Sequence, residues 1–187
     1  MTSFYTDEEL KVLGLKCYGK NVMISRKASL YNLTEISVGN SVRIDDFCIV
    51  SGKVNFGDYI HLAAYSALYA GDTGITIENY ATISSRVCVY AISDDYSGET
   101  MTSPMIPEQY RDRDKKHVTI CKYAIIGTGS TILPGVMVAE GTAIGAMSLC
   151  KESTDPWMIY AGIPARAIKA RKKDLLALTD SFENSIK

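Results

Sequence analysis

Two histidines and one pair of adjacent acids are the side chains in this sequence best suited to moving protons. The histidines are His61 and His117, and the acids Asp94 and Asp95 lie in the segment SDDYSG at 93–98. A general base works best when its pKa lies near the working pH, whereas an exposed aspartate with a pKa of about 4 is a poor base for an alcohol. Two acids followed by Ser-Gly are also an ordinary turn composition. The sequence therefore leaves open whether this pair does chemistry or only forms a turn.

Metal chemistry has little support. His117 follows Lys115 and Lys116, and we expect it to belong to a solvated basic cluster. Two isolated histidines do not make a zinc-ligand set. The five cysteines are scattered and include no CxxC pair, so we expect neither a metal site nor a disulfide framework.

A six-residue repeat extends through most of the chain. From Ile120, the hexads ICKYAI, IGTGST, ILPGVM, VAEGTA and IGAMSL each open with an aliphatic residue and have a small or β-branched residue at the fifth place. A period of six matches neither a helix nor a single strand pattern. Upstream hexads of the same type begin at Val38, Ile44, Val50, Phe56, Leu62, Ile77 and Ile83.

Equivalent hexads recur every 18 residues, as from Val38 to Phe56 and from Ile120 to Val138. Three short strands per turn, each opening with an inward aliphatic residue, predict a triangular parallel β-helix with coils about 4.8 Å apart. The step from Phe56 to Ile77 is 21 residues, which places three additional residues around 70–72.

Two flanking segments and one interruption lie outside the repeat. The segment TDEELKVLG has the pattern of a short helix, with Thr6 as N-cap and Glu9 at the capping-box position. The interruption is a long loop between the hexads, at 90–117. A long loop inside a compact domain is usually functional or disordered, and the prolines and tyrosines of this loop favour an ordered one. The predicted parts are an N-terminal helical cap (1–20), a β-helix (21–164) with an inserted loop (90–117) and a C-terminal helix (165–187).

Composition excludes several classes of partner. The net charge of −1 gives no electrostatic reason to expect nucleic acid or an anionic membrane. The polar, acidic N-terminus is not a signal peptide, and no apolar run is long enough to span a membrane. We therefore expect a cytoplasmic protein.

The aliphatic-Gly-x-x-small-x hexads, followed by YAGIPARAIKARKK at 160–173, resemble the hexapeptide-repeat acyltransferase superfamily. The resemblance covers almost the whole chain and is greatest to the sugar O-acetyltransferase branch, which includes the maltose, galactoside and lipopolysaccharide acetyltransferases. It implies a left-handed β-helix, a homotrimer with active sites between subunits, acetyl-CoA as the acyl donor, and a loop that covers a neighbour's site.

In that branch the base is a histidine at the start of the loop, and the matching position here is Asp94. Three hypotheses follow from this departure. His61 supplies the base and Asp94 or Asp95 orients it, the two meeting across a subunit interface. Alternatively, one acid of the pair is the base, with a pKa raised by its neighbour and by burial. In the third hypothesis the protein has lost catalysis.

The resemblance also assigns the donor side. Small residues allow the pantetheine arm to approach the backbone closely, and the oxyanion donor would be Thr128 or its amide. Trp157 or Tyr160 could stack on adenine, or could cap the core. The matching groove positions are Gly127, Thr128, Gly145 and Ala146, and the basic residues expected near the nucleotide phosphates are Lys151, Arg166, Lys169, Arg171, Lys172 and Lys173.

The function expected from these features is acetyl transfer from acetyl-CoA to a hydroxyl of a sugar or nucleotide sugar, plausibly in lipopolysaccharide or other surface polysaccharide biosynthesis. The alternative is N-acetylation of an amino sugar, or acetylation of an antibiotic. A non-catalytic β-helix scaffold is the second class, and binding of coenzyme A would distinguish it from an enzyme. A carbonic anhydrase of this fold would need three histidine ligands and is excluded because the chain has two.

Overall fold

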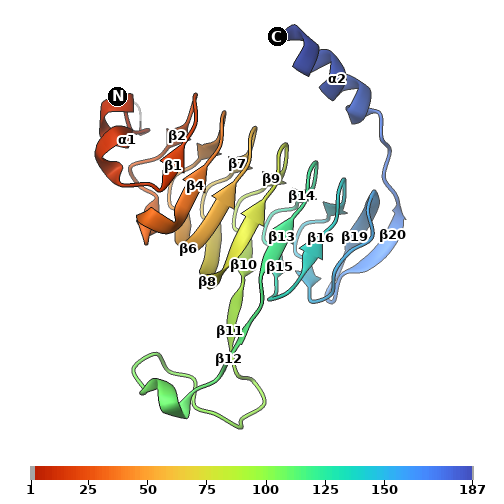
Figure 1. The fold of residues 1–187 in the computed structure, drawn as a ribbon. Helices are drawn as coiled ribbons and strands as arrows, with labels where there is room; N and C mark the ends of the chain where they lie inside the picture. Colours follow the sequence, from red (N-terminus) through yellow and green to blue (C-terminus); the bar gives the residue numbers. More distant parts are fainter. Residues whose placement is uncertain (1–2, 187) are drawn as a thin grey trace.

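The computed structural model describes residues 3–186, and the outermost residues of the two predicted terminal segments, 1–2 and 187, lie outside this range. Its body is a parallel β-helix whose short strands form three faces, so the predicted triangular coil is confirmed (Figure 1). In the part of the chain that the structure describes, no helix is both long and apolar enough to cross a membrane.

Each face is a ladder of parallel strands. The first face contains Cys17–Tyr18 (β1), Ile36–Val38 (β4), the second halves of Ile49–Phe56 (β6) and Ala67–Ile77 (β8), Val118–Ile120 (β13) and Met137–Val138 (β16). The second contains Met23–Ile24 (β2), Arg43–Ile44 (β5), His61–Leu62 (β7), Thr82–Ile83 (β9), Ile125–Ile126 (β14), Ala143–Ile144 (β17) and Met158–Ala161 (β19). The third contains Ser29–Tyr31 (β3), the first halves of β6 and β8, Cys88–Tyr90 (β10), Thr131–Ile132 (β15) and Leu149–Cys150 (β18).

The hexad pattern places the core. Every hexad-opening residue predicted from the sequence is at most 4% exposed, and the fifth-place residues are buried as well. Some fifth-place residues have hydroxyl side chains. Burying these hydroxyls costs little free energy because each donates a hydrogen bond to a backbone oxygen. Ser66 Oγ donates to Ser84 O at 2.8 Å, and Ser148 Oγ donates to Gly145 O at 2.7 Å.

The three additional residues lie where the sequence placed them. The offset between partners on β6 and β8 is 18 residues at Ser51 and Tyr69, and 21 at Val54 and Ile75. The corner absorbs the difference, and Gly71 there has a φ of 54° and lies against the Ile92 side chain. A larger residue at Gly71 would clash with Ile92 at the base of the inserted loop.

The N-terminal helix closes one end of the core. It spans Asp7–Leu13 (α1), and the predicted capping box is present, with Glu9 N donating to Thr6 Oγ1 at 3.3 Å. Leu10 is buried in the core cluster. The β-helix begins at β1, slightly before residue 21, and a short 3₁₀ turn, Leu33–Glu35 (η1), lies between β3 and β4.

The prediction of a helix from residue 165 is wrong over its first part. Arg166–Ala170 (β20) is a strand that pairs antiparallel with β19, and the helix spans Leu175–Ser185 (α2). The physical reason is the edge of β19, whose free backbone groups are satisfied by a returning strand.

Helix α2 lies along the side of the coil. It packs against a column of stacked rings at one corner. Phe182 meets Tyr59 edge-on at 5.2 Å between centroids, and Tyr80 Oη donates to Glu183 Oε1 at 2.8 Å.

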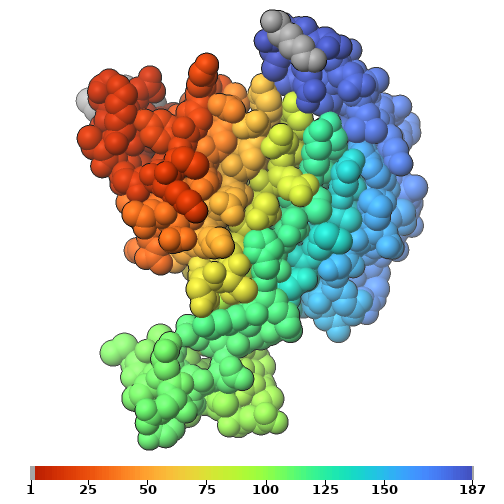
Figure 2. All heavy atoms as spheres, viewed as in Figure 1, coloured from red at the N-terminus to blue at the C-terminus, as the bar shows by residue number. Residues whose placement is uncertain are grey.

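The loop at 90–117 is ordered. Ile92–Asp94 (β11) and Arg113–Lys115 (β12) form an antiparallel ribbon, and Glu108–Tyr110 (η2) is a 3₁₀ turn near its tip. The ribbon projects from the body as a separate lobe (Figures 1 and 2). A lobe with few contacts to its own β-helix is suited to contact another molecule.

Candidate functional site

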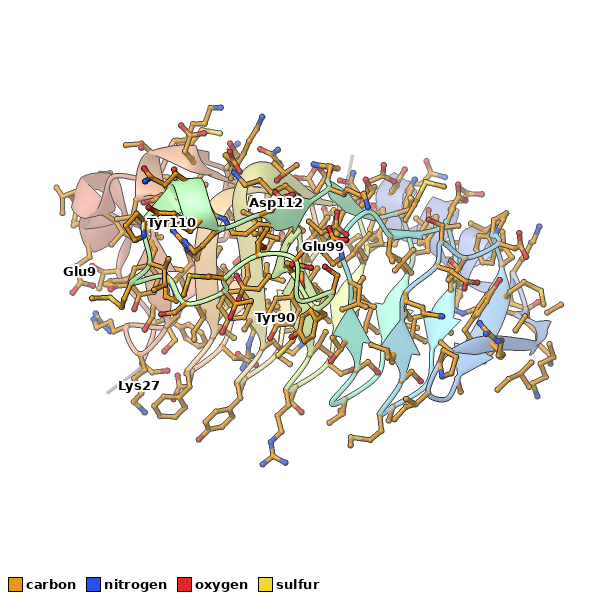
Figure 3. All side chains as sticks on the ribbon, turned by 90° about the horizontal axis from the view of Figure 1, so that it is seen from below. Glu9, Lys27, Tyr90, Glu99, Tyr110 and Asp112 are labelled. Carbon is orange, nitrogen blue, oxygen red and sulfur yellow. The ribbon has the colours of Figure 1, made fainter. Side chains whose placement is uncertain are left out.

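A cavity of about 600 Å³ lies where the ribbon leaves the coil. We call it the ribbon cavity. Asp94 lines it from β11, Lys116 from the end of the ribbon, and Lys151 from the late coils, with Leu133 and Pro134 as its apolar wall. Glu99 and Asp112, labelled in Figure 3, line it from the projecting lobe. The cavity therefore contains both acids and cations, and could hold a ligand with charges of both signs.

The two adjacent acids have different environments. Asp94 is exposed on β11 opposite Arg113 and faces the cavity without a role in the turn. Asp95 forms the turn, because its carboxylate accepts from Ser97 N at 2.7 Å and from Thr100 N at 2.9 Å. Hydrogen bonds from Ser97 and then Thr100 hold the pKa of Asp95 well below its usual value. The hypothesis of a raised pKa is therefore wrong for Asp95, whose carboxylate holds the turn.

We expect Asp95→Asn to loosen the lobe. The folded-state pKa is lowered, so the stabilisation by Asp95 is present above the unfolded pKa of about 4 and is lost only as the pH falls through the lower folded value. The amide chemical shifts of Ser97 and Thr100, followed by NMR during acidification, should therefore stay native below pH ~4. In the variant both amides should exchange faster at neutral pH. A transition of these amides near the ordinary aspartate pKa would contradict this role.

Within one chain, His61 contacts Asp45. Its Nε2 lies 2.8 Å from Asp45 Oδ2, and Asp45 Oδ1 accepts from Arg43 Nε at 2.7 Å. His61 does not line the ribbon cavity that contains Asp94. Within one chain, the expected pair of His61 with Asp94 or Asp95 is therefore not formed.

His117 is exposed at the end of the ribbon, as expected. Its Nδ1 lies 3.1 Å from Thr73 O, so the ring bonds β8 directly after the additional residues of its corner. Among residues 3–186, no group of three or more histidines, cysteines, aspartates or glutamates is arranged to hold a metal ion.

The residues that directly follow the strands of the second face stack from coil to coil in a column. We call this column the second corner. Its members come from successive coils and are joined by backbone hydrogen bonds, such as Gly127 N to Ile144 O at 2.8 Å. The column includes Asp45, Ala63, Ser84, Gly127 and Gly145. Asp45, and with it His61, thus lies on the same edge as the glycines expected to hold the pantetheine arm.

The glycines of this column have a structural reason besides ligand approach. A Cβ at Gly127 would lie 2.5 Å from Ala146 N and 2.7 Å from Gly145 C, whereas a Cβ at Gly145 would meet the Ala161 side chain at 2.9 Å. Thr128 and Ala146 are exposed beside them, where a ligand could reach their backbone groups.

The expected phosphate-binding cations are partly brought together. Lys151 Nζ and Arg166 Nη1 both approach Glu152, at 4.0 and 3.7 Å, and Lys169 is exposed on the same strand as Arg166. Arg171 is used differently, since its guanidinium donates to Tyr123 O and Gly141 O, both at 2.9 Å. Arg171 therefore fastens the chain leading to α2.

Trp157 and Tyr160 are structural. Trp157 is 9% exposed and lies over Gly141, at 6.1 Å from the Tyr123 ring. Tyr160 Oη accepts from Asp155 N at 3.0 Å. These contacts support core capping, the second of the two roles considered.

Three side chains of these sites were missed in the sequence: Asp45, Lys116 and Ser84. Asp45 and Ser84 could have been found by following the coil period, because both directly follow a hexad-opening aliphatic residue, as Gly127 and Gly145 do, whereas Lys116 lies outside the repeat. Their residue types alone did not indicate a functional site, since acids, lysines and serines are frequent on any protein surface.

The known proteins that are similar to this chain are acyltransferases. No protein-family model matches the sequence. A dTDP-4-amino-4,6-dideoxy-D-glucose acyltransferase from Escherichia coli is 46% identical over 185 residues, which are 97% of this chain and 96% of the relative. The lipopolysaccharide biosynthesis O-acetyl transferase WbbJ of Escherichia coli K12 is 27% identical over 168 residues, covering 85% of this chain and 78% of that protein.

Among solved structures, AntD, an N-acyltransferase from Bacillus cereus, in complex with dTDP and 3-hydroxybutyryl-CoA has a TM-score of 0.98 and 53% identity, covering 100% of this chain and 99% of that one. The D94A variant of AntD has been solved with dTDP and coenzyme A, and the S84C variant with dTDP-4-amino-4,6-dideoxyglucose and coenzyme A. The left-handed parallel β-helix expected from the resemblance is confirmed.

Proposed function

Because this chain belongs to the hexapeptide-repeat acyltransferases, and within them to the family of the dTDP-amino-sugar acyltransferases, we propose that it transfers an acyl group from acyl-CoA to the amine of a nucleotide-linked amino sugar. The full-length likeness to AntD carries the proposal. Acyl-CoA dependence agrees with the donor expected from the sequence. The likeness to amino-sugar acyltransferases favours the alternative, an amine acceptor, over the leading expectation of a sugar hydroxyl.

The ribbon cavity fits an acceptor of this kind. An amino sugar linked to a nucleoside diphosphate has a basic nitrogen at one end and negative phosphates at the other. Asp94 can hold the nitrogen, and Lys116 can pair with phosphate oxygens. This chain has an aspartate and a serine at positions 94 and 84, the numbers at which AntD has been varied. The product would be a building block for surface glycans such as lipopolysaccharide.

The reaction needs a neutral amine. Its nitrogen attacks the thioester carbonyl carbon, and a C–N bond forms while the C–S bond breaks. One nitrogen proton passes to a base, and the departing thiolate of coenzyme A takes up a proton. We assign the role of base to His61 and contact with the amine to Asp94. The groove for the acyl donor is assigned to Gly127, Thr128, Gly145 and Ala146. The phosphates of coenzyme A would lie near Lys151, Arg166 and Lys169.

His61 and Asp94 lie on different edges of one β-helix, so we propose that they meet between subunits of a homotrimer. The lobe of one subunit would then reach the second corner of the next. Sedimentation equilibrium should give three times the chain mass of 20.5 kDa, and a monomer that is fully active would contradict a shared site.

The acceptor is tested with two matched nucleotide sugars. dTDP-4-amino-4,6-dideoxyglucose and its analogue with a hydroxyl in place of the amine are each incubated with acetyl-CoA or 3-hydroxybutyryl-CoA, and loss of the thioester is followed. We expect kcat/KM to be at least about 100-fold higher for the amine, because a site built to bind the amine leaves its polar groups unpaired with the analogue. A preference for the hydroxyl would restore the O-acetyltransferase hypothesis.

A further inference from the structure

The contact between His61 and Asp45 determines which ring nitrogen has the proton. Asp45 is held on both sides, by His61 Nε2 at 2.8 Å and Arg43 Nε at 2.7 Å, and its side chain is 17% exposed. Arg43 and His61 are register partners on β5 and β7, so both side chains leave the same face next to the second corner. Arg43, Asp45 and His61 therefore form one hydrogen-bonded cluster on the outer side of the coil.

Asp45 is an acceptor in this cluster. Burial acts to raise its pKa, but the hydrogen bonds from His61 and Arg43 outweigh burial, and the pKa of Asp45 is lowered. An ionised carboxylate has no proton to donate, so the hydrogen between Asp45 and His61 belongs to Nε2. In the neutral imidazole, Nδ1 then has the free lone pair.

We propose that Asp45, fixed by Arg43, is a positioning residue that holds His61 as the Nε2–H tautomer and aims its Nδ1 lone pair at the acceptor amine. The inference rests on the proposed function, in which His61 takes the proton. The place fits this role, because Asp45 is in the same column as Ser84 and Gly127, where the donor thioester would lie. His61 is 42% exposed, which leaves its outer nitrogen accessible.

The tautomer can be observed without any substrate. The chain has only two histidines, and His117 serves as an internal reference of the opposite type. Its Nδ1 faces the carbonyl oxygen of Thr73 and must donate, so His117 should be the Nδ1–H tautomer. Two-bond ¹⁵N–¹H correlation spectra above the histidine pKa should therefore show one ring of each kind.

The decisive variant is Asp45→Asn, whose amide group can donate to Nε2 and favour the other tautomer. The matched control is Asp46→Asn, because Asp46 lies next in the chain but bonds Ser25 and Lys27, at 2.5 and 2.9 Å, away from His61. We expect Asp45→Asn to convert the His61 signal to Nδ1–H and to lower kcat by about 100-fold or more, with little change in KM for acyl-CoA. Asp46→Asn should keep both the signal and kcat.

The double variant Asp45→Asn/His61→Ala separates positioning from general destabilisation. It should be no slower than His61→Ala alone, because a positioning residue has nothing left to orient. An Nδ1–H signal for His61 in the native protein, or an unchanged kcat in Asp45→Asn, would overturn the inference and leave the proposed function standing. Absence of transfer by the native enzyme would instead overturn the proposed function, whatever the tautomer.

Discussion

Asp94→Asn should lower kcat for the amino-sugar acceptor by about 100-fold or more while coenzyme A still binds. Asparagine has nearly the shape of aspartate but no charge, so it would hold the amine of the acceptor less firmly in the position for attack on the thioester. Asp94 is exposed in the ribbon cavity on β11, whereas the donor groove is proposed at the second corner. The effect should therefore appear in turnover and in KM for the acceptor. Steady-state kinetics and calorimetry with coenzyme A measure the two separately.

The matched control is Asp72→Asn. Asp72 pairs with Lys115 at 3.3 Å near the base of the ribbon, but it does not line the ribbon cavity, and its side chain is 73% exposed. The substitution Asp72→Asn removes the same charge as Asp94→Asn from the same region, and it should leave turnover unchanged. If both variants lost activity equally, the loss would reflect the net charge of the region, and Asp94 would have no specific role.

Gly127→Ala should destabilise the protein strongly, by about 3 kcal/mol, because the new methyl group would overlap backbone atoms. The nearest atoms are Ala146 N at 2.5 Å and Gly145 C at 2.7 Å. They are held in place by the ladder, since Met147 N donates to Thr128 O at 2.8 Å in the same corner. The coil cannot widen here without breaking these hydrogen bonds. Thermal unfolding, with acyl-CoA affinity measured in parallel, tests this expectation.

Gly145→Ala provides the comparison. Its Cβ would meet the Ala161 side chain at 2.9 Å, close to the terminal hairpin of β19 and β20, which can shift more easily than an interior coil. We expect a smaller fall in Tm for this variant. If Gly127→Ala kept its Tm and lost only acyl-CoA binding, the glycine would serve the donor and not the stacking of coils.

The β-helix could be predicted in detail because its pattern is local and repeated. Each hexad states by itself which residue faces inward, and twelve such residues are all at most 4% exposed. Even the irregular step could be predicted, since the step from Phe56 to Ile77 exceeds the 18-residue period by three residues and the repeat then continues. The capping box of Thr6 and Glu9 is equally local.

The C-terminal segment could not be predicted in this way. Ile168 fits a helical spacing with the leucines that follow it, yet Arg166–Ala170 is a strand. Its conformation is decided by the unpaired edge of β19, which no local pattern reveals. For the same reason the contacts of α2 with Tyr59 and Tyr80 followed only from the fold.

The coil and its interruption could be predicted from the sequence because periodicity is a property of the chain order, and the resemblance to a known superfamily supplied the expectation of acetyl-CoA as the donor. The different environments of the two adjacent acids became visible only in the folded chain. Asp94 and Asp95 are neighbours in sequence, but one faces a cavity and the other binds the amides of its own turn. His61 and Asp45 are 16 residues apart and come into contact because successive coils stack them. Hydrogen bonds and pKa values depend on such contacts through space, and the order of residue types does not contain them.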